Sequence, residues 1–155
     1  MSSTINLTTE PEVVTRPAFH YLYMEKTGYI PSIAQGTWQA VEKFSGQIAQ
    51  HGQIVGACAL YKCKPDVYRA GYVLAEPPAQ VPEGLSYEEI PGGKYTRFVL
   101  TGPYSQLPEA TSRAFQIAAE KGVALGDGFN IENYVTDPRT TPQDQSITEI
   151  LFPTH

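Results

Sequence analysis

The chain has 155 residues, of which 41% are hydrophobic and 17% charged, and its formal net charge at pH 7 is −5. This size and composition predict one globular domain with a substantial core and exclude a disordered chain. Direct binding of nucleic acid is not expected, because it needs a basic surface and no Lys- or Arg-rich run is present. The acidic balance favours cationic ligands over anionic ones.

The sequence shows no sign of targeting or membrane insertion. Its first ten residues are polar, without a charged start followed by an apolar core, and no apolar run is long enough to span a bilayer. Cys58 and Cys63 are the only cysteines and make no disulfide framework. We therefore expect a cytoplasmic protein without a signal peptide.

The first half of the chain is expected to hold a strand, a helix and two further strands. Residues 13–24 alternate as a strand does. Residues 32–50 carry apolar side chains at helical spacing, after a capping box formed by Ser32 and Gln35. The next strands are expected at 55–62 and 68–75, with a turn at 64–66. The core-facing stripe of the helix comprises Ala34, Trp38, Val41, Phe44 and Ile48.

The second half follows a connector at residues 76–84 that contains three prolines. Strands are expected at 85–90 and 94–101, joined as a hairpin at Pro91-Gly92-Gly93, where glycine permits positive φ. A helix is expected at 106–121, ended by Gly122, and the last strands at 129–136 and 146–152. The buried stripe of this helix comprises Leu107, Thr111, Ala114, Phe115 and Ala118.

The two halves repeat the same order of elements: strand, helix, strand, turn with proline, strand. Aligning the turn prolines sets Tyr61 beside Tyr134. The sequence therefore predicts an α+β fold built from two similar halves, at about 12–76 and 84–153.

Residues 90–104 carry every fixed position of the pattern I-P-[AG]-G-x-Y-x-x-F-x-x-x-G-P-Y. This stretch resembles the signature of the GyrI-like small-molecule-binding family, which also supplies effector-binding domains to AraC-type and MerR-type regulators. The resemblance implies one stand-alone domain over residues 1–155, made of two pseudo-symmetric β-α-β-β repeats. Their antiparallel sheet would line a central cleft, with the two helices on the outside. The resemblance is strong in the second half and loose in the first.

Residues 132–138 look like the family's E-x-Y-x-x-D-P motif. In the family this glutamate lies at the bottom of the cleft and pairs with the positive charge of lipophilic drugs and dyes. The resemblance therefore implies Glu132 as the counter-ion of a ligand and Tyr134, on the same strand face, as a stacking wall. The alternative is a solvent-facing glutamate on a strand.

A carboxylate among aromatic rings loses hydration, so the pKa of Glu132 should be raised in the empty site. A cation close to it would recover about 4 kcal/mol at an effective dielectric of about 20. Each aromatic face adds roughly 0.5–2 kcal/mol through cation–π attraction. None of these terms needs a shaped hydrogen-bond pattern, so such a pocket would accept many flat cations.

The chain contains ten Tyr and six Phe, which suit an amphipathic pocket. Trp38 is a further candidate for ligand contact, although core packing is the favoured role for a residue on the buried stripe. For each aromatic candidate, ordinary sheet packing is the alternative. The aromatic wall is expected to draw on Tyr21, Tyr61, Tyr68, Tyr95, Tyr134 and Phe152.

No metal or cofactor is expected. His20, His51 and His155 are scattered, and with the two cysteines they match no zinc spacing. Cys58 and Cys63 have opposite parity on a strand and are interpreted as small buried hydrophobes. The sequence has no phosphate loop, dinucleotide fingerprint or nucleophile elbow.

Three functions stay open at this point. The first is a binding module for amphipathic, cationic small molecules such as a drug, toxin or effector. The second is an enzyme, because some GyrI-like proteins hydrolyse cyclopropane-bearing genotoxic natural products; Glu132 would then be the general base, and Trp38 and Tyr134 would shape the site. The third is a protein that binds and antagonises DNA gyrase. Binding without catalysis is favoured, with a small molecule as the partner, neither nucleic acid nor membrane, and a homodimer or protein partner left open.

Overall fold

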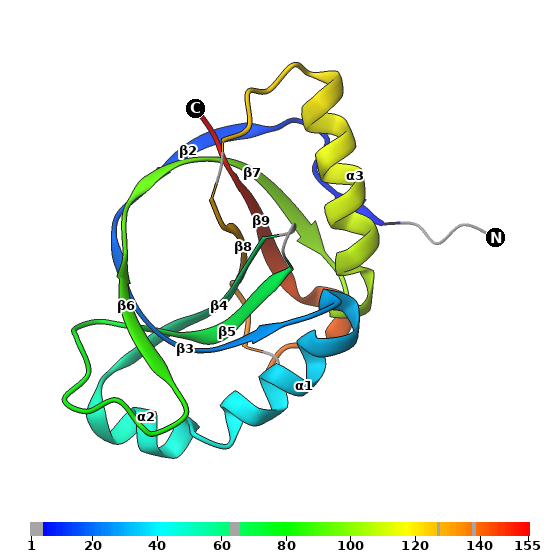
Figure 1. Ribbon diagram of the computed structural model, residues 1–155. Coiled ribbons are helices and arrows are strands. Elements are labelled where there is room, and N and C mark those ends of the chain that lie inside the picture. The colour runs from blue at the N-terminus through cyan, green and yellow to red at the C-terminus, as the bar shows by residue number, and fades with distance from the viewer. Residues whose placement is uncertain (1–4, 63–65, 127, 138) are drawn as a thin grey trace. The chain divides into compact units, whose positions relative to one another are not determined.

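The computed structural model describes residues 5–62, 66–126, 128–137 and 139–155 (Figure 1). The chain divides into two compact units. One comprises Arg16–Gly93, and the other combines Met1–Thr15 with Lys94–His155. The division therefore falls after residue 93, whereas the proline-rich connector at 76–84 lies inside the first of these units.

The Arg16–Gly93 unit is a four-stranded antiparallel sheet with two helices. The sheet has the order β4-β5-β3-β6. Its elements are β3 (Phe19–Thr27), α1 (Ile30–Glu42), α2 (Ser45–His51), β4 (Ile54–Lys62), β5 (Val67–Leu74) and β6 (Ser86–Ile90).

The helices of this unit pack against one face of its sheet. Leu22 on β3 and Leu74 on β5 form a buried core with Val41 of α1 and Ile48 of α2, and Trp38 and Phe44 pack against that core. This confirms the stripe predicted for these four helix residues. α1 contacts β3 and β5, as Figure 1 shows.

The helix predicted at 32–50 is divided into α1 and α2. α1 begins at Ile30 after Tyr29 as N-cap, and no side chain caps its first turn. The capping box of Ser32 and Gln35 is therefore wrong, because both residues lie inside the helix rather than at its boundary. Phe44 separates the two helices and is the N-cap of α2.

The other unit is built around its own group of antiparallel strands and one long helix. The strand order is β1-β7-β9-β8, and β2 also pairs with β7. Its elements are β1 (Asn6–Leu7), β2 (Glu12–Arg16), β7 (Gly93–Thr101), a 3-10 turn η1 (Tyr104–Gln106), α3 (Leu107–Glu120), β8 (Asn130–Tyr134), a second 3-10 turn η2 (Gln143–Gln145) and β9 (Ile147–Pro153).

α3 packs on this sheet through a stripe of small residues. Ala110, Ala114 and Ala118 are fully buried, and their size lets the helix backbone approach the strands closely. The helix ends at Glu120 with Lys121 as C-cap, and Gly122 follows with a φ of 70°, a conformation that glycine permits without strain. Figure 1 shows α3 beside β7 and β9. The sheet side of this core comprises Phe98, Leu100, Ile150 and Phe152.

Two strand predictions need correction. The strand predicted at 13–24 is two strands, β2 and β3, with Pro17 and Ala18 between them. The predicted hairpin of residues 85–90 and 94–101 does not form, because β6 pairs with β3 and β7 pairs with β9.

Gly92 is required by close approach rather than by a hairpin turn. Neither Gly92 nor Gly93 has positive φ. A Cβ at Gly92 would lie 2.6 Å from the carbonyl oxygen of Arg16 and 2.9 Å from the nitrogen of Ala18. Backbone atoms cannot move aside at low cost, so only glycine fits.

The remaining predicted strands, and the helix predicted at 106–121, lie within a few residues of their predicted bounds. Residues 64 and 65 of the turn predicted at 64–66 lie outside the described residues, as do Cys63 and Pro138. No helix in the described part of the chain has the length and apolar character needed to cross a membrane.

Candidate functional site

Glu132 lies on β8 and faces α3. It is directly opposite Ile150 on β9, and Tyr134 is directly opposite Thr148. Opposite residues of an antiparallel pair share a face, and Ile150 is part of the core beneath α3. The resemblance placed the cleft on the side of the sheet away from the helices, whereas the register puts Glu132 and Tyr134 on the side that α3 covers.

The Glu132 carboxylate has one hydrogen-bond donor and no cationic partner among the described residues. The hydroxyl of Tyr134 donates to Oε1 of Glu132 at 2.9 Å, while every ion pair found involves other acids. The side chain keeps some solvent access, yet surrounding protein desolvates it and raises the pKa of Glu132 to about 7. The hydrogen bond from Tyr134 opposes this shift.

One pair of aromatic rings flanks Glu132 along its own strand. The rings of Tyr134 and Tyr104 meet edge to face, with centroids 5.3 Å apart. Tyr104 opens η1 directly after Gly102-Pro103. Gly102 has a φ of 153°, and its N–H donates to the carbonyl of Ser146 at 2.8 Å. The glycine-proline step of the signature thus turns the chain so that Tyr104 reaches Tyr134.

A second pair of rings lies on the same sheet face as Glu132, toward the diagonal position on β9. Phe152 is the diagonal neighbour of Glu132 across the β8–β9 pair, a position that an aromatic side chain can reach. The ring of Phe115, from α3, stacks on Phe152 with centroids 4.0 Å apart and an interplanar angle of 17°. Phe152 is fully buried, whereas Phe115 is 38% exposed. We call Tyr104, Tyr134, Phe115 and Phe152 the aromatic bracket.

Tyr95 does not share a wall with Glu132. It lies on β7 opposite Pro153, while its neighbour Thr96 is opposite Phe152. The alternation of side chains therefore places Tyr95 on the sheet face away from α3. Its predicted part in the same aromatic wall is incompatible with this register.

Three of the predicted site residues come together in the Arg16–Gly93 unit. The indole Nε1 of Trp38 on α1 donates to the hydroxyl of Tyr68 at 2.8 Å, and Tyr68 is directly opposite Tyr61. The three side chains lie on the helix-covered face of their sheet. Tyr72, four residues after Tyr68 on β5, adds an edge-to-face contact with Trp38 at 6.2 Å and is absent from the predicted site.

Tyr21 lies on the opposite face of that sheet and is fully buried. Its hydroxyl donates to the carbonyl oxygens of Cys58 at 2.7 Å and Arg69 at 3.2 Å. Burial raises the pKa of Tyr21 well above its usual value. These contacts tie three strands together and separate Tyr21 from the group formed by Trp38, Tyr61 and Tyr68.

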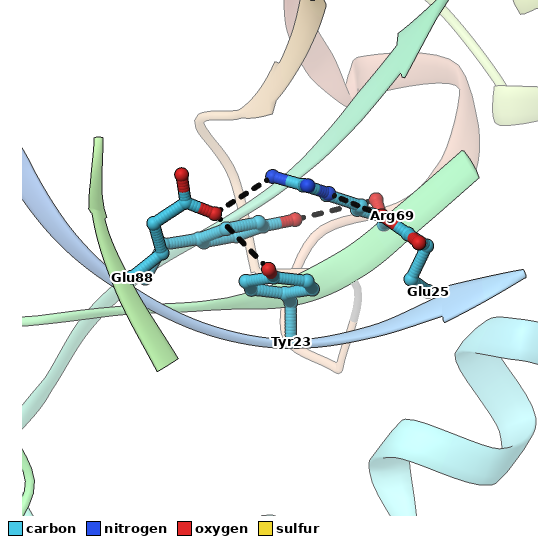
Figure 2. A network of polar contacts seen from close by, with 5 residues as sticks. Tyr23, Glu25, Arg69 and Glu88 are labelled. Carbon is cyan, nitrogen blue, oxygen red and sulfur yellow. Dashed lines mark hydrogen bonds and ion pairs between the residues drawn. The ribbon is translucent and has the colours of Figure 1, made fainter. Parts of the chain in front are cut away.

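The ring of Tyr21 stacks on that of Tyr23 with centroids 5.0 Å apart. Tyr23 belongs to an ionic cluster that the sequence did not predict (Figure 2). Nε of Arg69 donates to Glu25 at 2.8 Å, and one terminal nitrogen donates to Glu88 at 3.1 Å. The hydroxyl of Tyr23 also donates to Glu88 at 3.1 Å, and the Arg69 guanidinium lies 4.6 Å from the Tyr23 ring centre. Burial alone would lower the pKa of Arg69, but the hydrogen bond that Arg69 donates to Glu25 and the negative charges nearby outweigh it and raise that pKa.

Nothing in the described ranges resembles a metal centre, since no three His, Cys, Asp or Glu side chains come together. The residues that matter beyond those predicted are Tyr104 and Phe115. Tyr104 was visible as the last position of the 90–104 signature. Phe115 was assigned to the buried stripe of its helix, and its exposure depends on how α3 docks.

The mixed α+β fold, in which helices pack on antiparallel strands, is that of a known class of small-molecule-binding domains. The chain belongs to the GyrI-like family: the profile of the GyrI-like small molecule binding domain matches residues 9–155. This confirms the family and the fold class inferred from the signature. None of the curated protein sequences matches the chain.

Solved structures share the fold at low sequence identity. SAV2435 bound to tetraphenylphosphonium is 13% identical, with a TM-score of 0.76 and 94% of each chain covered. The C-terminal domain of EcmrR is 13% identical, with a TM-score of 0.77 over 94% of this chain and 97% of that one. A hydrolase encoded by lin2189 from Listeria innocua is 12% identical, with a TM-score of 0.58 over 97% and 94%.

Proposed function

We propose that this chain binds an amphipathic organic cation on the α3 side of the Lys94–His155 unit, with Glu132 as the counter-ion. One observation carries the proposal: a half-buried carboxyl lies within the aromatic bracket and has no basic partner in the described part of the chain. A bound cation would supply the positive charge that no basic residue in the described part of the chain provides to Glu132. The tetraphenylphosphonium in SAV2435 supports the choice of ligand class.

The energetics favour a cation over a neutral ligand of the same shape. At an effective dielectric of about 20, a unit charge 4 Å from the carboxylate gains about 4 kcal/mol. The accessible rings of the bracket add apolar contact with the organic groups of the cation. Because rings and one charge impose little directional demand, we expect affinity for several lipophilic cations rather than for one.

Titration with tetraphenylphosphonium, followed by calorimetry at pH 8, tests the proposal. Glu132→Gln keeps the size of the side chain and removes its charge, so affinity should fall at least tenfold. Glu120→Gln is the matched control. Glu120 is exposed on α3, and its substitution removes the same charge from the same unit. The control should stay within twofold of the wild type. The absence of saturable binding, or equal affinity in Glu132→Gln, would contradict the proposal.

Hydrolysis is the second candidate, because a carboxyl with a pKa of about 7 is suited to act as a general base near neutral pH. The substrate would be a strained, cyclopropane-bearing compound. Glu132 would take a proton from the water that attacks the ring carbon and would return that proton to the opened ring. Incubation with a panel of such compounds, followed by mass spectrometry, separates the two functions. Turnover that Glu132→Gln abolishes favours hydrolysis, whereas saturable binding without turnover leaves the chain a binding protein.

A further inference from the structure

Phe115 is the most accessible ring of the aromatic bracket. Its exposed fraction is 38%, while Phe152 beneath it is fully buried. One face of the Phe115 ring is occupied by the stack with Phe152 at 4.0 Å. The structure thus keeps a large apolar ring partly in solvent on the helix that covers the Glu132 face, although three alanines of the same helix are completely buried.

The position of Phe115 relative to Glu132 follows from the strand register. Phe152 and Glu132 are diagonal neighbours on β9 and β8, a separation of about 7–8 Å between their backbones. Phe152 on the sheet stacks with Phe115 of α3, so this pair of rings stands on the same sheet face as Glu132, at its diagonal position on β9. Tyr134, about 7 Å from Glu132 along β8, closes the other side.

We infer that Phe115 determines the ligand class of this site, selecting cations that carry aryl groups over cations that carry only alkyl groups. The inference rests on the function proposed above and adds to it. Glu132 recognises charge alone and attracts both kinds of cation equally. Phe115 offers a ring edge and face to a ligand held at Glu132, and an aryl group gains an offset or edge-to-face contact there that an alkyl chain does not.

The sequence pattern alone gives Phe115 a different role, that of a core residue on a buried stripe. The two roles make different predictions about ligand preference. A core residue affects all ligands through stability, whereas a contact residue affects aryl ligands more than alkyl ligands. An aromatic contact of this strength changes affinity by roughly two- to tenfold.

The test compares tetraphenylphosphonium with tetrabutylphosphonium, which has the same charge and no ring. Phe115→Leu should lower the affinity for tetraphenylphosphonium three- to tenfold and leave the affinity for tetrabutylphosphonium within twofold of the wild type. Phe115→Tyr keeps the ring and should keep the wild-type ratio of the two affinities. Phe44→Leu is the matched control, since Phe44 packs in the core of the other unit and its loss should not change the ratio.

The possible results separate this inference from the proposed function. If the wild type binds neither cation, the proposed function fails. If both cations bind and Glu132→Gln weakens both, but Phe115→Leu leaves the ratio unchanged, the proposed function stands and the role of Phe115 is overturned. A thermal unfolding curve accompanies each variant, and if Phe115→Leu does not fold, a changed ratio in Phe115→Tyr overturns the inference.

Discussion

Two glutamates of this protein accept a hydrogen bond from a tyrosine hydroxyl, yet their surroundings differ. Tyr134 donates to Glu132 at 2.9 Å, and Tyr23 donates to Glu88 at 3.1 Å. Glu88 also pairs with Arg69, whereas Glu132 has no cationic partner among the described residues. Glu88 therefore belongs to a self-sufficient ionic cluster, and Glu132 is left with a raised pKa.

The difference separates a structural acid from an acid that is available to a ligand. Arg69, Glu25 and Glu88 join three neighbouring strands of one sheet, so their charges are used within the fold. The Arg97 guanidinium plays a similar part in the other unit, where it pairs with Glu12 and Glu149. Glu132 follows neither pattern, and an uncompensated acid of this kind indicates function more often than stability.

Removing the central cation of the cluster should have the largest effect on stability. Arg69→Met keeps the apolar length of the side chain and leaves two carboxylates without a partner. Since both carboxylates are partly exposed and can be hydrated, we expect a loss of about 2 kcal/mol in the free energy of unfolding. Chemical denaturation at pH 7 measures it. The exposed Arg113→Met is the control, and an equal loss in both variants would show that the cluster contributes nothing specific.

Neutralising Glu132 should increase the free energy of unfolding rather than lower it. Its folded pKa of about 7 lies above the usual value, so ionisation of Glu132 is harder in the folded chain than in the unfolded chain. Stability is therefore lost as pH rises from about 4.5 to 7. The full shift corresponds to roughly 3 kcal/mol, which partial solvation reduces to about 1–2 kcal/mol.

Glu132→Gln should accordingly gain about 1–2 kcal/mol over the wild type at pH 8.5 and about nothing at pH 4. Unfolding in urea at both pH values measures the difference. A variant less stable than the wild type at pH 8.5 would show that Glu132 is held as a structural carboxylate, like Glu88.

The smallest effect is expected for Tyr134→Phe. The Tyr134 hydroxyl favours the ionised form of Glu132, so its loss should raise the pKa of Glu132 further. Carboxyl carbon shifts in a pH titration by NMR report this pKa directly. An unchanged pKa, with the fold intact, would mean that the hydrogen bond does not affect the acid.

Local patterns in the sequence predicted which side chains share a strand face. Glu132 and Tyr134 lie on the same strand face, as the alternation of side chains predicted. The 90–104 signature led to the family. These properties depend only on backbone geometry within one strand and on a linear motif.

Properties that depend on strand order were not predictable from the sequence. A glycine pair between two strands is the local signal of a hairpin, but β6 pairs with β3 through contacts far apart in the chain. The pairing of Arg69 with Glu88 follows from that strand order, so the ionic cluster could not be predicted from the sequence either. Phe115 follows the helical period of its stripe, and only the docking of α3 leaves it partly exposed.

The central claim is that Glu132 must be ionised to hold a cation. The most direct measurement is the affinity for tetraphenylphosphonium, which has no titratable group, at pH 6 and pH 8. With a pKa of about 7, ionisation of Glu132 rises about tenfold over this interval, so affinity should rise about tenfold in the wild type and stay constant in Glu132→Gln. Equal affinity of the wild type at both pH values would contradict the account.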